Sequence, residues 1–370
     1  MATNAYEREQ ERAEAQAQAY LNGAASAGLR AALSIPTDAP LVPHLLGMGE
    51  HNINVWFAAP DDHRFVLRIN VATQPFHTNQ IRYEYGALEA ACPSGCTPAP
   101  LFLDDSAQAP GKGVLVETFC AGQQLDFDDL RPGDVRCALQ MMADVHAVEM
   151  PAATTLFRPA DPLREMFDEC AQRFASYRAS GFEDARITRW TERFMAATRA
   201  MLDAVAPPQD IGHLINTETL PSHFLIPADA AARAAAAPAA GTGRFCEAPG
   251  CFVDWERPVI GEVAQDVAYF VSPTTTFWDS SFLFPVCDVA GMIDEYWRAV
   301  DGRFPRTDFE SRFRAWRMMT ALKSTTWCVQ AIPRYSSNTG AHTTEKTAGK
   351  LPVYLSDEFM ELIAKECFYL

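Results

Sequence analysis

The sequence lacks the features that would assign it to a membrane or secreted class. No apolar run in the chain is long enough to span a bilayer as a helix, which takes about 20 residues. The first residues, 1–17, are rich in Glu, Arg, Gln and Ala, and they contain no apolar stretch typical of a secretory signal. These absences predict a chain with no membrane partner, and we expect to find it in the cytoplasm.

Basic residues are scarce relative to acidic ones. Lys and Arg total 31 against 47 Asp and Glu, so the formal net charge is -16. A nucleic-acid backbone attracts clustered Lys and Arg, so this balance argues against nucleic acid as a partner. The negative charge is compatible with attraction of a cationic small molecule. The plainer explanation is that it only keeps the protein soluble.

Cysteine is present, but its spacing follows no recognisable framework. Ten cysteines are scattered along the chain, and without a secretory leader we expect them to be reduced thiols. Two short pairs stand out, Cys92 with Cys96 and Cys246 with Cys251. Two pairs could hold a tetrahedral zinc ion if they met in space. Neither has the two-residue spacing of common zinc knuckles, so ordinary thiols are the favoured interpretation.

What the sequence does contain is enough apolar residues for a core, and a change of pattern along its length. Hydrophobic residues make up 48% and charged residues 21%, which indicates a globular chain. From Leu41 onward the pattern is one of strands and turns, and after Gly122 it becomes helical. We therefore expect a helical arm over 1–40, a strand-rich lobe over 41–121 and a helical lobe over 122–370.

The strand-rich lobe carries a candidate ion pair. The segment 64–69 alternates, which places Val66 and Arg68 on one face and three apolar side chains on the other. One of the two could lie over a nucleobase while the other reaches phosphate. Before the other motifs are considered, a surface arginine on a strand is an equally good interpretation. The helix expected over 80–91 offers Glu84 as a partner for Arg68.

Two further segments of this lobe fit nucleotide binding, and each has a plainer interpretation. The apolar strand at 114–122 ends in a glycine and could be a hinge whose backbone around Glu117 and Phe119 reads adenine. An ordinary core strand has the same pattern. The turn at 47–54 is rich in small and polar residues, so its backbone N–H groups could approach phosphates. A plain hairpin turn is the more common case.

The order of these motifs resembles that of the aminoglycoside phosphotransferase and choline kinase superfamily. Further along, 142–146 reads Met-Ala-Asp-Val-His, 252–256 reads Phe-Val-Asp-Trp-Glu, and 265–270 supplies another Asp. That superfamily carries an Ile-Asp-Trp-Glu-like magnesium motif followed by a helix that bears an Asp. The resemblance covers about residues 41–330. It implies an α+β, bilobal, protein-kinase-like fold, with a small antiparallel-sheet N-lobe and a larger helical C-lobe.

The resemblance also implies cofactors and the residues that hold them. The cofactor would be ATP or GTP with Mg²⁺ or another divalent metal, and Asp254 would be the main metal ligand. Arg68 and Glu84 would clamp the phosphates. The residues assigned to nucleotide binding are Arg68, Glu84, Val66, Glu117 and Phe119.

The catalytic loop, expected at 211–226, departs from the family pattern of His-x-Asp, four residues, then Asn. Asn216 stands for the His, Glu218 for the Asp and His223 for the Asn. His213 cannot supply the family His, because an isoleucine would then occupy the Asp position. Glu218 keeps a carboxylate on a side chain one methylene longer. His223 is a candidate second metal ligand, although imidazole suits transition metals better than magnesium.

Acid and amide groups therefore survive in this loop in rearranged form. We expect an ATP- or GTP-dependent phosphotransferase that acts on a hydroxyl of a small metabolite or aminoglycoside-like amine. Glu218 is its candidate base and Asn216 a brace for the loop. The alternative is a catalytically inactive pseudokinase that binds nucleotide as a regulator. A third class, an interaction scaffold, would bind no nucleotide.

The acceptor site is only weakly marked in the sequence. Aromatic and acidic residues together suit an amine, although core or surface positions are the more common role for each. The candidates in the helical lobe are Trp278, Asp279, Asp294, Glu295 and Trp297.

Between the catalytic loop and the metal motif, residues 227–243 are rich in Ala with Pro and Gly. This composition is typical of an insertion in a hairpin rather than of a packed element. We therefore expect the insertion to be disordered and dispensable.

Overall fold

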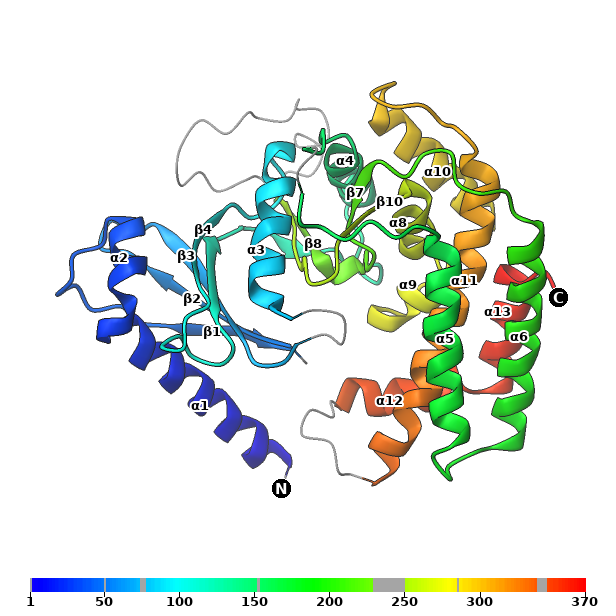
Figure 1. Ribbon diagram of the computed structural model, residues 1–370, viewed down its shortest axis with the longest axis horizontal. Helices are drawn as coiled ribbons and strands as arrows, with labels where there is room; N and C mark the ends of the chain where they lie inside the picture. Colours follow the sequence, from blue (N-terminus) through cyan, green and yellow to red (C-terminus); the bar gives the residue numbers. More distant parts are fainter. Residues whose placement is uncertain are drawn as a thin grey trace. The chain divides into compact units, whose positions relative to one another are not determined.

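Figure 1 shows a computed structural model of the chain. It describes residues 2–49, 51–73, 78–151, 154–228, 250–284, 286–337 and 345–370. The chain forms two units. The first comprises Met1–Gln123, Met150–Leu156 and Phe224–Arg257, and the second comprises Gln124–Glu149, Phe157–His223 and Pro258–Leu370. Apart from positions 227 and 228, the expected insertion at 227–243 lies outside the described residues.

A five-stranded antiparallel sheet forms the centre of the first unit, with the strand order β1-β2-β3-β5-β4. Its strands are β1 (His44–Met48), β2 (Asn52–Ala58), β3 (Arg64–Asn70), β4 (Pro100–Asp104) and β5 (Val114–Thr118). The unit also contains α1 (Ala2–Leu21), α2 (Ala27–Leu33), α3 (Gln80–Ala91), β8 (Phe224–Ile226) and β9 (Cys251–Phe252). The short strand β6 (Gln123–Gln124) falls at the boundary between the units.

Alternation along the strands gives this sheet an apolar face and a polar face. Leu67 and Ile69 of β3 are fully buried in one cluster with Val114 and Val116 of β5. Because successive side chains point to opposite faces of a sheet, Arg68 lies on the other face. The alternation expected for segment 64–69 is thus confirmed.

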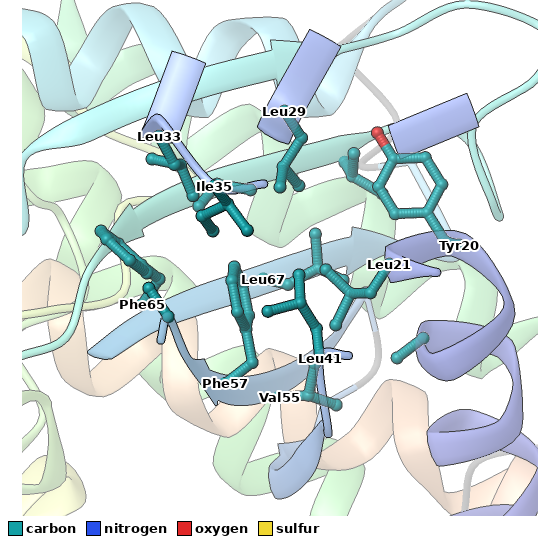
Figure 2. Close-up of a cluster of buried hydrophobic side chains, with 14 of the residues drawn as sticks. Tyr20, Leu21, Leu29, Leu33, Ile35, Leu41, Val55, Phe57, Phe65 and Leu67 are labelled. Carbon is teal, nitrogen blue, oxygen red and sulfur yellow. The ribbon is translucent and has the colours of Figure 1, made fainter. Parts of the chain in front are cut away.

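Helices α1 and α2 cover the apolar face (Figure 2). Tyr20 and Leu21 at the end of α1 and Leu29 of α2 lie in the same buried cluster as Phe57 of the sheet. The segment expected to be a helical arm, 1–40, therefore contributes to the core of the sheet. The physical reason is that an apolar sheet face must be covered by another layer, and these helices provide it.

A turn and a helix cap position α3 beside the sheet. The side chain of Asn79 accepts a hydrogen bond from the backbone N–H of Arg82 at 3.2 Å, which satisfies one of the free donors of the first turn. The helix contacts β4 and β5. It follows the boundaries predicted for it, 80–91.

The segment 224–257 belongs to the first unit, although the sequence-based division placed it in the helical lobe. Strand β8 pairs antiparallel with β9, with Phe224 opposite Phe252. The backbone N–H of Phe252 also donates to the carbonyl of Cys96 at 2.7 Å. These backbone contacts hold the metal motif against the N-terminal part of the chain.

A disulfide joins Cys120 to Cys251, which are 131 residues apart in sequence. This corrects the expectation that all cysteines are reduced, because the fold brings the segment after β5 next to β9. Cys246, which was noted for its short spacing from Cys251, lies outside the described residues. Within the described part of the chain, no group of three or more His, Cys, Asp or Glu side chains is arranged to hold a metal ion.

The second unit is mostly helical. Its elements are α4 (Asp134–His146), α5 (Pro162–Arg178), α6 (Ala185–Ala204), β7 (His213–Ile215), β10 (Val259–Gly261), α8 (Val263–Phe270), α9 (Pro273–Asp279), α10 (Val286–Val300), α11 (Phe309–Ser337), α12 (Glu345–Tyr354) and α13 (Asp357–Cys367). Helix α11 is central and packs against α5, α6, α8 and α13 (Figure 1). Strands β7 and β10 form a two-stranded antiparallel sheet.

The expected α+β fold, with a small antiparallel-sheet unit and a larger helical unit, is confirmed. Two helices of the second unit show no long helical period in the sequence, because α9 has only 7 residues and α12 contains Pro352. None of the helices in the described ranges combines the length and apolar character of a membrane span.

We predict that Leu21→Ala lowers the free energy of unfolding by about 2–5 kcal/mol, because it would leave a cavity beneath α1. Leu21 is fully buried. The matched control is Leu46→Ala on β1, where the side chain is 50% exposed and the loss should stay within about 0.5 kcal/mol. Urea titrations followed by tryptophan fluorescence measure both. Equal midpoints for the two variants would show that α1 does not belong to the core.

We also predict that reduction lowers the thermal midpoint of the protein, because the cross-link restricts the unfolded chain. In non-reducing buffer, Cys120→Ser should behave like the reduced wild-type protein, whereas Cys92→Ser should keep the higher midpoint. Alkylation under denaturing, non-reducing conditions, followed by mass spectrometry, counts the thiols. Modification of all ten cysteines would rule out the bridge.

Candidate active site

In the first unit, Arg68 on β3 lies among three carboxylates. Its Nη2 atom lies 3.1 Å from Glu84 Oε2, 3.4 Å from Asp254 Oδ1 and 3.6 Å from Glu256 Oε1. The predicted contact between Arg68 and Glu84 is therefore present. Their side chains are only 8% and 1% exposed, so water screens this pair weakly. We call these four residues the Arg68 cluster.

Two amide side chains hold the carboxylates of the Arg68 cluster. Asn52 Nδ2 donates to Glu84 Oε1 at 3.1 Å and to Glu256 Oε1 at 2.7 Å. Gln80 Nε2 donates to Glu84 Oε1 at 3.0 Å and to the backbone carbonyl of Glu256 at 2.7 Å. Sequence reasoning gave neither amide a role. The one available signal was the position of Gln80 one helical turn before Glu84.

With all three carboxylates ionised, the Arg68 cluster would carry more negative than positive charge. Burial, and then the nearby carboxylates, raise the pKa of Glu256 to about 9. Burial also raises the pKa of Glu117 on β5 to about 7, against the opposing effect of Arg68. Burial lowers the pKa of Arg68 itself, but the carboxylates around it outweigh this and hold the guanidinium charged. A ligand that brings a cation would relieve the excess of negative charge.

Two polar groups here have no hydrogen-bond partner in the part of the chain that the structure describes. The Nε atom of Arg68 is buried without one. Glu117 is 6% exposed and interacts electrostatically with Arg68 and Glu84, but no described residue donates a hydrogen bond to its carboxylate. Both groups can therefore accept a ligand without breaking a bond within the described chain.

Asp254 sits on a turn directly after β9. Its φ is 64°, a left-handed conformation that is uncommon for a residue other than glycine and that recurs at functional sites. The Nε1–H of Trp255, which is 2% exposed, donates to the carbonyl of Phe252 at 2.8 Å and closes the turn. The side chain of Asp254 is 36% exposed. A packed turn thus presents a partly solvated carboxylate.

Aromatic residues lie on the polar face of the sheet, beside the Arg68 cluster. His44 stacks on Trp56 with 4.4 Å between ring centroids, and Trp56 meets Phe119 edge-on at 6.1 Å. The guanidinium of Arg64 lies 4.2 Å from the centre of the Phe119 ring. The backbone N–H of Phe119, expected to read adenine, donates to the carbonyl of Arg64 at 3.3 Å. Val66 lies opposite Trp56 in the sheet.

In the second unit, Asp266 on α8 organises the expected catalytic loop. Its two carboxylate oxygens accept the backbone N–H groups of Asn216 and Thr217, each at 2.8 Å. The Nε2 atom of His146 lies 3.2 Å from the same carboxylate, and its Nδ1 atom lies 2.7 Å from the hydroxyl of Tyr296. Asp266 and His146 are fully buried. The second Asp of the family resemblance therefore braces the loop from within the core.

Glu218 extends from this braced loop toward a lysine. The Oδ1 atom of Asn216 accepts the backbone N–H of Glu218 at 3.2 Å, and Thr217 between them has a φ of 72°. Lys323 Nζ on α11 lies 2.9 Å from Glu218 Oε1 and 5.0 Å from the centre of the Tyr269 ring. Sequence reasoning missed Lys323 because it follows Glu218 by 105 residues, on a helix that carries no motif.

His223 ends a short 3₁₀ helix, Pro221–His223, within the segment 211–226. Its backbone N–H donates to the carbonyl of Leu220 at 3.0 Å. His223 belongs to the second unit and Asp254 to the first, so the two proposed metal ligands come from different units.

The acceptor candidates separate into two groups within the second unit. Ser222, next to His223, donates from Oγ to Asp279 Oδ2 at 2.7 Å. Trp278 packs edge-on against Trp327, which follows Lys323 by one turn of α11. Asp279 therefore contacts the loop that carries Glu218, whereas Trp278 contacts the helix that carries Lys323.

The other acceptor candidates make different contacts. Glu295 Oε1 on α10 lies 2.6 Å from Arg136 Nε. Trp297 packs edge-on against Phe309, with 5.1 Å between centroids. Neither contact involves the catalytic loop.

Comparison with known proteins places the fold. No family model matches the sequence, and neither does any curated protein. Among solved structures, a putative aminoglycoside phosphotransferase from Ralstonia eutropha aligns over 92% of this chain and 98% of its own, with a TM-score of 0.61 and 13% identity. The chain has the fold of the aminoglycoside and small-molecule kinases.

Two further kinase structures support this fold assignment. The ethanolamine kinase of Plasmodium vivax aligns over 92% of this chain and 87% of its own, with a TM-score of 0.57 and 10% identity. The amicoumacin kinase in complex with AMP-PNP, Ca²⁺ and Ami aligns over 88% and 89%, with a TM-score of 0.54 and 9% identity. The expected kinase-like fold is confirmed.

We predict that Asp266→Asn destabilises this kinase-like chain by about 1.5–3 kcal/mol, because it replaces one of two charged acceptors with a donor that faces a backbone N–H. The matched control is Asp203→Asn, the same change at an exposed position on α6. Chemical denaturation measures both. If the two variants were equally stable, Asp266 would not be the brace of the loop.

Proposed function

We propose that this chain is a nucleotide-dependent phosphotransferase that acts on a hydroxyl group of a small molecule. The observation that carries the proposal is the Arg68 cluster, in which Arg68 contacts Glu84 at 3.1 Å and the partly exposed Asp254 at 3.4 Å. Phosphoryl transfer requires a cation that binds the phosphates and an oxygen ligand for a metal ion. The cluster contains both kinds of group, in a chain whose fold is that of small-molecule kinases.

The residues of the cluster fit a nucleotide with a divalent metal ion. The unpartnered Nε of Arg68 can donate to a phosphate oxygen, a charge-assisted bond of the stronger kind. Asp254 and Glu256 supply the oxygen atoms that Mg²⁺ prefers, and Mg²⁺ commonly binds through one or two carboxylates together with phosphates. When bound, the ion neutralises negative charge on the phosphates. The structure of the amicoumacin kinase holds both AMP-PNP and Ca²⁺.

In this proposal Glu218 acts on the acceptor hydroxyl. Its ion pair with Lys323 restrains a side chain that is one methylene longer than Asp. An ionised carboxylate can only accept hydrogen bonds, so it can orient the hydroxyl that donates to it. Asn216 fixes the backbone of Glu218, and His223 remains a proposed second metal ligand.

An amine is the acceptor class that the second unit favours. Asp279 contacts the loop of Glu218 through Ser222, and Trp278 packs against Trp327 on α11, the helix that carries Lys323. An aromatic face and a carboxylate both attract a cationic group. The ethanolamine kinase that shares this fold is named for a substrate that contains an amine.

A second candidate function is that of a nucleotide-binding regulator without turnover. The contact between Lys323 and Glu218 favours it, because the lysine already lies 2.9 Å from Oε1, one of the two carboxylate oxygens that an acceptor hydroxyl would approach. Catalysis and regulation make the same prediction for nucleotide binding and differ only in phosphotransfer.

We predict that Asp254→Asn abolishes metal-dependent stabilisation by ATP, whereas Glu218→Gln preserves it and removes phosphotransfer. The amide at position 254 still fits but lacks the charge that holds the metal. A ligand that binds only the folded state raises its midpoint, so thermal shifts with ATP or GTP and Mg²⁺, Mn²⁺ or Zn²⁺ measure binding. Phosphotransfer is measured with a panel of amino alcohols and aminoglycosides.

Three outcomes of this experiment are informative. The reverse pattern of binding effects would show that the roles of Asp254 and Glu218 are wrongly assigned. A wild-type chain with no metal-dependent nucleotide binding would favour an interaction scaffold. Nucleotide binding without turnover on any acceptor in the panel would favour the regulator.

A further inference from the structure

The Cys120–Cys251 disulfide connects the same two segments as the contact between Arg68 and Asp254. Cys251 is the first residue of β9, and Asp254 follows it by three positions. Cys120 follows β5, the strand on which Leu115 lies opposite Arg68. All of these residues belong to the first unit. The sheet and the metal motif are therefore joined twice, by the disulfide and by the 3.4 Å contact of Arg68 with Asp254.

Strand β9 is short, so it contributes few backbone hydrogen bonds of its own. It has two residues, and in its pairing with β8 Leu225 lies opposite Cys251 and Phe224 opposite Phe252. The rings of Phe224 and Phe252 stack with 4.4 Å between centroids, and the backbone N–H of Phe252 donates to the carbonyl of Cys96. These contacts do not need the disulfide. We therefore expect β9 to open locally, rather than to detach, when the disulfide is reduced.

The turn after β9 needs support in order to keep its conformation. Asp254 has a φ of 64°, which is unfavourable for a residue with a side chain and persists only where the surrounding structure imposes it. The indole of Trp255 ties this turn to Phe252 of β9. Because the turn is tied to the strand, local opening of β9 would release Asp254 from this conformation and from its contact with Arg68.

We propose that this disulfide is a redox switch that controls how tightly the chain binds a nucleotide with its metal ion. In the oxidised form the bridge holds the turn of Asp254 beside Arg68. In the reduced form the turn opens for part of the time, and Asp254 is then out of position to hold the metal. The inference rests on the proposed function and goes beyond it, because it gives that function a regulator, a dithiol.

The switching step is a thiol–disulfide exchange that begins at Cys120. Cys251 is fully buried, whereas Cys120 is half-buried, so a dithiol reaches the bridge from the side of Cys120. One thiolate attacks Sγ of Cys120 and forms a mixed disulfide, and Cys251 leaves as a thiolate that takes up a proton. The second thiolate of the dithiol then attacks its own partner sulfur and releases Cys120, which is also protonated. Two electrons pass from the dithiol, which becomes a disulfide, to the two cysteines, which become thiols.

Hydrogen exchange followed by mass spectrometry, on the full chain without metal or nucleotide, tests the conformational step. Dithiothreitol should speed the exchange of the backbone amides of 251–256 at least about tenfold, because exchange follows local opening, whereas helix α2 of the same unit should change by less than about twofold. Cys120→Ser should match the reduced wild-type protein. The matched control, Cys92→Ser, should match the oxidised protein.

Calorimetry with ATP, first with Mg²⁺ and then with EDTA, tests the functional step at a temperature well below both thermal midpoints. In the oxidised protein Mg²⁺ should increase the affinity for ATP. Reduction should cut this gain at least about fivefold, because the apparent affinity falls with the fraction of chains in the competent conformation. Metal-free binding of ATP should stay within about twofold, since Arg68 lies on β3 and keeps Glu84 as its partner. Oxidised glutathione, which re-forms the bridge by the reverse exchange, should restore the gain.

The outcomes separate the switch from the proposed function. A Mg²⁺-dependent gain that is equal in the oxidised and reduced proteins, or an equal acceleration of exchange in α2, would overturn the switch and leave the phosphotransferase proposal intact. Failure of both forms to bind ATP would overturn both. The reduced wild-type protein provides each measurement without a substitution, so the test stands even if Cys120→Ser fails to fold.

Discussion

The buried guanidinium of Arg68 is the interaction on which the first unit depends. A cation that is 8% exposed is stable only if carboxylates surround it, and the chain supplies three of them from segments that are distant in sequence. Glu84 comes from α3, whereas Asp254 and Glu256 follow β9. The need to neutralise one charge therefore ties the metal motif to the sheet, although some 186 residues separate Arg68 from Asp254.

The same cluster contains an imbalance that suits it to bind a ligand. Three carboxylates outnumber the one guanidinium, and burial first, then the neighbouring carboxylates, raise the pKa of Glu256. A protein core built for stability alone would replace such a group with apolar side chains of similar volume. A metal ion with phosphates would meet the unpartnered Arg68 Nε and the crowded carboxylates together, which is why the cluster is more informative about function than any single motif.

In the second unit, buried side chains hold an unusual loop in one conformation. Thr217 has a positive φ and would relax without support. Asp266 supports the loop by accepting two backbone hydrogen bonds. His146 contacts Asp266 in turn, and Tyr296 contacts His146. With its backbone fixed, the loop can carry Glu218 in place of a shorter Asp, and Lys323 restrains the additional methylene.

The sequence by itself determined the local pattern and the order of the motifs. Alternation over 64–69 put Arg68 on the face away from the core, and helical spacing gave α3 its bounds, because both periods depend only on neighbouring residues. The same information led to the kinase-like fold and to the pairing of Arg68 with Glu84. These predictions needed no knowledge of contacts across the chain beyond one family pattern.

Only the tertiary structure decided which distant residues meet. The bridge from Cys120 to Cys251, the contact of Lys323 with Glu218 and the burial of Glu117 depend on how separate segments pack, and no local period encodes them. The covering of the sheet by α1 was missed for the same reason, since a helix rich in polar residues shows its few buried side chains only when its partner is known. Long-range packing is a property of the whole chain, so these features emerged only with the fold.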